Sequence, residues 1–239
     1  MRVVDGVLYD VIKGNLELLE RNPTEFWEGV TAIGDGAFRH CNGLESIEIP
    51  EGVREIGMGA FYGCYNLTSA KLPSTLKWIG HEAFACTSLA KIEIPEGMSN
   101  IVAYTFWHCM NLTSVKLPIT LKKIGDFAFN ETCLTNIEIP EGVVSIGDHA
   151  FDNKTALHYK GYIIKGNEKC SSVSVLSEMI KVSNDPKKRD KLDFLITYLT
   201  VIKDVDIVKE EKVAKADKAE NAEVKISPKP VNKNTGKGE

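Results

Sequence analysis

The sequence lacks a long apolar run: its 239 residues nowhere hold the roughly 18 consecutive apolar residues that a transmembrane helix requires. Its first residues include Arg2, Asp5 and Asp10 and no apolar core, so we expect no signal peptide. It also lacks a surplus of positive charge, because 29 Lys and Arg face 33 Asp and Glu, for a net charge of −4. These absences argue against membrane insertion and against a dedicated nucleic-acid binder.

Sequence motifs of catalytic and cofactor sites are missing as well. There is no C-x-x-C pair for zinc, no G-x-x-x-x-G-K-[ST] loop for a nucleotide, and no G-x-G-x-x-G. The five histidines are scattered over the chain at positions 40, 81, 108, 149 and 158. We therefore expect no enzymatic activity, no cofactor and no metal.

What the sequence does contain is a repeat. Phe recurs at 38, 61, 84, 106, 129 and 151, and Pro recurs at 50, 73, 95, 118 and 140, so the period is 22 or 23 residues. Each unit follows the frame I-G-x-x-A-F-x-x-C-x-x-L-x-x-I-x-I-P-x-x-V. The strand segments alternate IEIPEG with A/V-K-L-P, which adds a superperiod of about 45 residues and indicates a duplicated two-coil unit. A fixed period of this length predicts a solenoid.

These units resemble the BspA-like leucine-rich repeat family, which has the same frame at about 23 residues. The resemblance covers roughly residues 30–162 and implies a solenoid used for protein binding, often in secreted or cell-surface adhesins and interaction proteins. Unit four departs from the frame, with Val102 in place of Gly and Thr105 in place of Ala. We expect a local change in the turn there.

The alternation in I-x-I-P places both Ile residues on one face of a strand, so stacked coils form a parallel sheet over one continuous core. The middle residues form an alternating ladder of charges on the outer face. We expect this ladder to favour the correct order of coils, because opposite charges on neighbouring strands attract. This sheet face is either a solvated surface or, less favoured, a docking face; the ladder consists of Glu48, Lys71, Glu93, Lys116 and Glu138.

Five of the six cysteines follow the recurring Phe by two to four residues. Burial as small apolar groups is the favoured interpretation. Disulfides between adjacent coils, which need an oxidising compartment, and a metal site are the less favoured alternatives. These cysteines are Cys41, Cys64, Cys86, Cys109 and Cys133.

Some aromatic residues occupy positions for which the frame does not demand an aromatic. Tyr and Trp are enriched in the energetic centres of protein interfaces, so these residues are candidates for binding a partner. The competing interpretation is that Tyr104 and Phe127 only fill space under a bent loop. The candidate binding residues are Tyr62, Trp78, Tyr104, Trp107 and Phe127.

The ends predict caps for the solenoid. Turn signals at Asp5-Gly6 and Gly14-Asn15 between apolar residues favour capping strands over residues 1–29, followed by the solenoid over 30–165. Val173, Leu176 and Met179 have helical spacing, which predicts a helical cap over 166–205. The balanced charges and low hydrophobicity of 206–239 predict a disordered tail.

We therefore expect an α/β repeat solenoid with a parallel sheet face, an N-terminal β cap and a C-terminal helical cap. The expected function is non-enzymatic protein binding, as an interaction or adhesion scaffold. The alternative is a structural or assembly role through the C-terminal helices and the tail. A monomer is compatible with the sequence. We expect a cytoplasmic location if the chain is complete, and a secreted or cell-surface location if a signal peptide has been removed.

Overall fold

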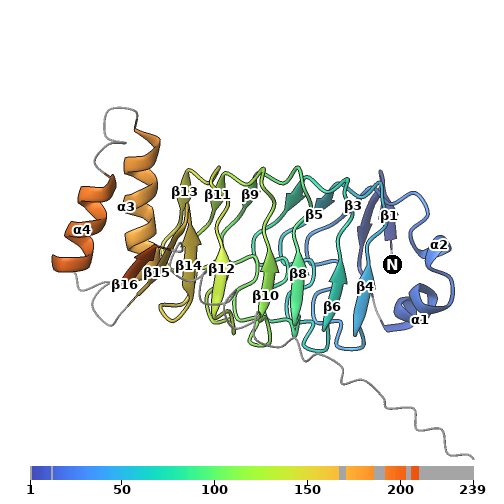
Figure 1. Cartoon of the computed structure of the whole chain (residues 1–239). Coiled ribbons are helices and arrows are strands. Elements are labelled where there is room, and N and C mark those ends of the chain that lie inside the picture. Colours follow the sequence, from blue (N-terminus) through green and yellow to red (C-terminus); the bar gives the residue numbers. More distant parts are fainter. Residues whose placement is uncertain (1, 12, 167–170, 186–191, 203–205, 210–239) are drawn as a thin grey trace, which may run out of the picture. The chain divides into compact units, whose positions relative to one another are not determined.

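A computed structural model describes residues 2–11, 13–166, 171–185, 192–202 and 206–209. The chain divides into two compact units, Met1–Val208 and Lys209–Glu239, and all but the first residue of the second unit lies outside the described residues. The first unit is built around a solenoid of about six coils, which confirms the predicted α/β repeat solenoid (Figure 1).

Each coil contributes one strand of two residues and then one longer strand, so the solenoid has two columns of parallel strands. The two-residue strands are β3 (Ala32–Ile33), β5 (Glu55–Ile56), β7 (Trp78–Ile79), β9 (Asn100–Ile101), β11 (Lys123–Ile124) and β13 (Ser145–Ile146). The three-residue strands are β4 (Ser46–Glu48), β6 (Ser69–Lys71), β8 (Lys91–Glu93), β10 (Ser114–Lys116) and β12 (Asn136–Glu138).

The three-residue strands pair in twos, in agreement with the superperiod of about 45 residues. Strand β4 pairs in parallel with β6, and β8 with β10. The turn after β4 is likewise bonded to the turn of the next coil. Glu51 accepts hydrogen bonds from Ser74, and the N–H of Gly52 donates to Thr75 at 3.0 Å. Two coils later, the N–H of Gly97 donates to Thr120 at 3.1 Å. The pairing of the three-residue strands and these turn hydrogen bonds therefore follow the two-coil unit.

The core is a single stack of side chains along the solenoid. Its centre is the Phe column, in which each ring is at most 1% exposed and stacks on the next at 4.8 to 5.6 Å between ring centroids. The inward Ile and Leu residues of the strands surround this column. Each coil thus packs chiefly on its two neighbours, as expected of a solenoid.

The stacking is loosest at unit four, where the sequence predicts a local change in the turn. The frame glycines permit close approach: a Cβ on Gly125 would lie 2.5 Å from the backbone N of Ala103. At the equivalent position Val102 carries a Cβ, and the two-residue strands separate there into a ladder ending at β7 and another beginning at β9. The widest spacing in the Phe column, 5.6 Å between Phe84 and Phe106, lies at the same junction.

The N-terminal cap contains strands and helices. Strands β1 (Arg2–Val4) and β2 (Val7–Tyr9) form an antiparallel pair, and β2 pairs in parallel with β3. The prediction of strands over the rest of 1–29 is wrong, because α1 (Lys13–Arg21) and α2 (Pro23–Phe26) follow. The Gly14-Asn15 pair lies inside α1, where Leu16 and Leu19 are spaced as on one helix face.

The C-terminal cap begins with an added hairpin. Strand β14 (Ala156–Tyr159) pairs in parallel with β12 and antiparallel with β15 (Tyr162–Lys165). Helices α3 (Ser172–Asn184) and α4 (Leu192–Ile202) follow, as predicted, and α3 buries apolar residues that include Leu176 and Met179. No helix among the described residues is long and apolar enough to cross a bilayer.

The predicted tail needs one correction. Residues Asp206–Lys209 form strand β16 on the free side of β15, and an ion pair of 4.0 Å joins Lys165 to Asp206. The β-branched Ile207 and Val208 favour this strand. The remainder of the tail predicted as disordered, residues 210–239, lies outside the described residues.

Candidate protein-binding surface

The turn around each core Phe uses left-handed backbone at fixed positions. Two residues before the Phe, φ is positive in all six coils, from 52° to 61°. Coils one and two place Gly36 and Gly59 there, and the later coils place Glu82, Tyr104, Phe127 and His149. A side chain at such a φ costs about 1–2 kcal/mol. Coils four to six therefore hold bulky residues at a position that favours glycine.

Hydrogen bonds to the next coil maintain this turn whatever its side chain. The N–H of Tyr104 donates to the carbonyl of Asp126 at 2.9 Å, and the N–H of Phe127 donates to the carbonyl of Asp148 at 3.0 Å. Gly36 and Gly59 make the equivalent bonds at 2.8 Å. These hydrogen bonds thus impose the left-handed backbone conformation on these coils, and the side chains of Tyr104, Phe127 and His149 extend from that position.

These side chains form an aromatic strip, which we define as Tyr104, Trp107, Phe127 and His149. The rings of Tyr104, Phe127 and His149 stack with centroids 5.0 Å apart, and Trp107 meets Tyr104 edge to face at 6.1 Å. Tyr104, Trp107 and Phe127 are half-buried, and His149 is exposed. The strip is a continuous apolar surface across three coils that solvent reaches.

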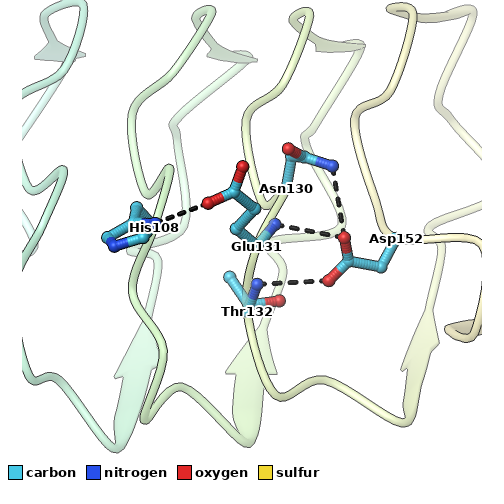
Figure 2. A network of polar contacts seen from close by, with 5 residues as sticks. All are labelled: His108, Asn130, Glu131, Thr132 and Asp152. Carbon is cyan, nitrogen blue, oxygen red and sulfur yellow. Dashed lines mark hydrogen bonds and ion pairs between the residues drawn. The ribbon is translucent and has the colours of Figure 1, made fainter.

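A polar network lies beside the strip (Figure 2). The Nδ1 atom of His108, next to Trp107, lies 2.5 Å from a carboxylate oxygen of Glu131 on the following coil. The carboxylate of Asp152, one coil further on, accepts hydrogen bonds from Asn130 Nδ2 and from the backbone N–H groups of Glu131 and Thr132, each at 3.2 Å. The network ties three successive coils together and gives the aromatic strip a polar rim.

The structure brings together three of the five predicted binding residues. Tyr104, Trp107 and Phe127 meet in the aromatic strip. Tyr62 lies instead in a cluster of coils one and two, with the guanidinium of Arg39 4.4 Å from its ring centroid. The pKa of Tyr62 is raised, chiefly by the negative charge of the ionised Cys86 thiol and then by desolvation. Trp78, 42% exposed, lies on β7 opposite Glu55.

Two residues of this surface were not among the sequence candidates. His149 shares the column of Tyr104 and Phe127, so its position in the repeat was the signal that could have identified it. His108 follows its core Phe by two residues, in a second column of positive φ with His40 and Glu131. In both columns, position within the coil predicts location better than residue type does.

The predicted charge ladder forms in pairs. Glu48 and Lys71 make one ion pair, and Glu93 and Lys116 make another, each on two hydrogen-bonded strands. The hydrogen bonds from these lysines to their glutamates raise the pKa of both Lys71 and Lys116. Glu138 lies on β12 in register with His158 of β14. The five charges are therefore grouped by the two-coil unit.

The cysteines that follow the Phe by three residues are buried, as the favoured interpretation predicts. The thiol of Cys64 donates to the Phe38 carbonyl at 2.9 Å, and that of Cys109 to the Phe84 carbonyl at 3.1 Å. Burial raises the pKa of Cys64 to about 12 and that of Cys109 to about 11. Cys41 is buried in the same way.

The two cysteines that follow their Phe by two or four residues instead of three are not fully buried. Cys86 is half-buried and Cys133 is exposed. In their coils the buried position belongs to Thr87 and Thr132, whose hydroxyls donate to the Phe84 and Phe129 carbonyls at 2.9 Å. All five cysteines are free thiols; within the described ranges, no three His, Cys, Asp or Glu residues are grouped as a metal site would require.

Comparison with known families identifies the repeat. The family model described as the BspA type leucine-rich repeat region matches residues 25–158 in six copies. This stretch is more than half of the chain and contains the aromatic strip. No curated protein matches the chain significantly.

Several solved structures are similar to parts of the chain. A leucine-rich cell surface protein from Faecalibacterium prausnitzii shares 29% identity with a TM-score of 0.43, over 59% of this chain and 48% of that chain. A leucine-rich repeat protein of T. pallidum shares 32% with a TM-score of 0.44, over 49% and 63%. One from Eubacterium ventriosum shares 29% with a TM-score of 0.45, over 53% and 35%. This chain thus spans less than two thirds of each.

Proposed function

We propose, from the premise that this chain belongs to the BspA-type leucine-rich repeat family, that it is a non-enzymatic module that binds a protein partner through the aromatic strip. A shared repeat fold does not by itself fix the partner, so function has to be argued from particular side chains. The exposed residues that the repeat frame does not demand are therefore the place to look for recognition.

The observation that carries the proposal is the backbone strain at Tyr104 and Phe127. Each occupies a left-handed position that Gly36 and Gly59 fill without cost in the first coils. Strain of about 1–3 kcal/mol per residue is often found where side chains serve function. The stacked rings provide an apolar centre, and His108 and Glu131 provide a polar rim, which together match the anatomy of interface centres.

The partner expected from this surface is a protein that presents a flat apolar or aromatic patch. An edge-to-face contact such as that of Tyr104 with Trp107 contributes about 0.5–1.5 kcal/mol, and an incoming ring can extend the stack in the same way. Removal of one such ring from the centre of an interface costs about 2 kcal/mol or more.

Quantitative affinity capture with the full-length chain tests the proposal. The strip variant carries Tyr104→Ser and Trp107→Ala, and the matched control carries Tyr62→Ser and Trp78→Ala, which removes equal aromatic types outside the strip. We expect the strip variant to lose at least one stoichiometric partner that the wild type and the control both retain. Equal capture by both correctly folded variants would contradict the role of the strip and favour the C-terminal helices and tail.

A further inference from the structure

The N-terminal cap continues one strand column of the solenoid and leaves the other open. Strands β1 and β2 extend the column of two-residue strands through β3. The column of three-residue strands ends at β4, which pairs only with β6 among the described strands. Helix α1 lies beside β4, where a further strand would otherwise pair (Figure 1). Strand β4 is therefore a sheet edge.

The backbone of β4 presents hydrogen-bonding groups on this open side. The carbonyl of Glu45 accepts from Thr68, and the N–H of Ile49 donates to Lys71, so these residues face β6. Successive residues of a strand direct their backbone groups to opposite sides. The N–H and carbonyl groups of Ser46 and Glu48 consequently face the cap, and no described residue pairs with them there.

A groove of about 780 Å³ runs along this edge, a volume within the range of about 300–1,000 Å³ of ligand sites. We call it the edge groove. Leu16 and Leu19 of α1, with Trp27 and Val30 after α2, form its apolar wall, and Leu44 to Glu48 form the opposite side. The Nε1 group of Trp27 is buried without a hydrogen-bond partner among the described residues.

The charge of the edge groove has one sign. Glu20, Glu45, Glu48 and Glu51 line it, and no Lys, Arg or His does. Glu48 is paired with Lys71, and Glu51 accepts hydrogen bonds from Ser74. Among the residues whose side chains the structure describes, none forms an ion pair with Glu20 or Glu45. Glu45 is also specific to the first coil, because Thr68, Ala90, Thr113 and Thr135 occupy its position in the later coils.

We propose that the edge groove binds an extended basic peptide segment of a partner protein, which adds a strand to β4. The backbone of the peptide pairs with Ser46 and Glu48, and its apolar side chains contact Leu16 and Leu19. Its Lys or Arg side chains meet the carboxylates of Glu20, Glu45 and Glu48. Main-chain pairing supplies affinity and the alternate side chains supply specificity in this mode of recognition. The site shares no residue with the aromatic strip, so this proposal is independent of the proposed function of the strip.

The probe for this proposal is a fluorescein-labelled, N-acetylated hexapeptide of alternating Val and Lys, titrated with the full-length chain and followed by fluorescence anisotropy. We expect saturable binding with one peptide per chain. A second probe has the same sequence with N-methyl groups on alternate amides, in both possible phases. At least one phase should fail to bind, because the methyl groups block strand pairing without changing charge.

Three protein variants locate the site. Glu45→Thr installs the residue of the later coils, and Glu48→Gln removes the charge on β4; each should weaken binding roughly two- to fivefold, as expected for a partly exposed charge pair. Glu93→Gln is the matched control: Glu93 has the same column and the same kind of lysine partner, but its strand β8 packs between β6 and β10 and has no open side for a peptide. It should leave binding unchanged.

The proposal is overturned if the hexapeptide does not bind saturably, in which case the acidic edge serves only to prevent aggregation. It is equally overturned if both N-methylated probes bind as well as the parent, or if Glu93→Gln weakens binding as much as Glu45→Thr does. A concentration-dependent dimer that excludes the peptide would assign the edge to a second copy of the chain instead.

Discussion

The two ends of the solenoid stop the repeat in opposite ways. At the N-terminal end, strands β1 and β2 extend the two-residue column, and a helix lies beside the three-residue column. At the C-terminal end, β14, β15 and β16 extend the three-residue column, and α3 packs against β13, β14 and β15. Each cap therefore combines strands with helices, but the strands extend the two-residue column at one end and the three-residue column at the other.

The exchange leaves a groove at one end and a closed junction at the other. The face of α3 toward the last coil buries Val175, Leu176 and Met179 completely, so its junction with the solenoid is closed. The junction of α1 with β4 instead leaves the edge groove. Strand β4 is therefore an edge beside a groove, whereas the hairpin of β14 and β15 covers the corresponding side of β12.

The largest difference should appear when each cap loses one leucine. Leu176→Ala should lower the free energy of unfolding by about 2–5 kcal/mol, because it leaves a closed cavity under α3. Leu16→Ala should cost about 2 kcal/mol, the transfer term alone, because the edge groove already opens beside it. Urea unfolding followed by circular dichroism measures both, and an equal or larger loss for Leu16→Ala would contradict the contrast between the ends.

A second test compares the first and last frame glycines. A Cβ on Gly147 would lie 2.4 Å from the backbone N of Asp126, whereas a Cβ on Gly34 would lie 2.4 Å from the ring of Tyr9. We expect Gly147→Ala to lower the free energy of unfolding by about 1–3 kcal/mol, since backbone must shift. Gly34→Ala should cost less, because the Tyr9 ring can move and the nearest backbone atom, the Leu8 carbonyl oxygen, is farther away at 2.9 Å. The order of the two thermal midpoints decides the comparison.

The turn column gives a third, smaller contrast between the first coils and the last. Gly59→Ala should lower the free energy of unfolding by about 1–2 kcal/mol, because it places a side chain at positive φ. Phe127→Gly should change it by no more than about 1 kcal/mol, since relief of the same strain offsets the lost ring stacking. Calorimetry of the two variants measures this, and a strong destabilisation by Phe127→Gly would indicate that the ring serves the fold.

The smallest effect should come from the exposed ion pairs at the edge and in the interior. Glu48→Gln and Glu93→Gln should each lower the thermal midpoint slightly in dilute buffer and not at high salt, because surface pairs are weak and screened. Double-mutant cycles with Lys71 and Lys116 isolate the two pair energies. Similar values would show that the edge position of Glu48 does not alter its pairing.

The solenoid is predictable from the sequence because residues one period apart stack directly on each other in the core. The Phe and Pro columns locate every coil, and the substitution of Val102 for Gly locates the break in stacking. The N-terminal helices are harder to predict, since Gly14-Asn15 is a turn signal by residue type and only the packing of Leu16 against the first coil favours a helix. Strand β16 likewise depends on a partner, β15, that is distant in the chain.

The candidate surface is only partly predictable from the sequence. Tyr104 and Phe127 share a repeat column, so their proximity follows from the period. Tyr62 shares the column of Trp107 but lies two coils away from it, and Trp78 occupies another column. Residue type alone therefore cannot separate these two aromatics from the strip. Glu45 differs from the residues of its column in the sequence, but its importance depends on β4 being an edge, which only the fold establishes.

The alternation of turns in the two-coil unit limits how this protein can change in length. Glu51-Gly52 needs Ser74-Thr75 on the next coil, and Gly97 needs Thr120 in the same way. Deletion of the coil that carries Ser74-Thr75, or insertion of a second Glu-Gly coil beside the first, would place two Glu-Gly turns side by side, with no hydroxyl to receive the glycine N–H. A gain or loss of about 45 residues keeps every such bond. Recombination or engineering should therefore lengthen or shorten the solenoid by two coils at a time.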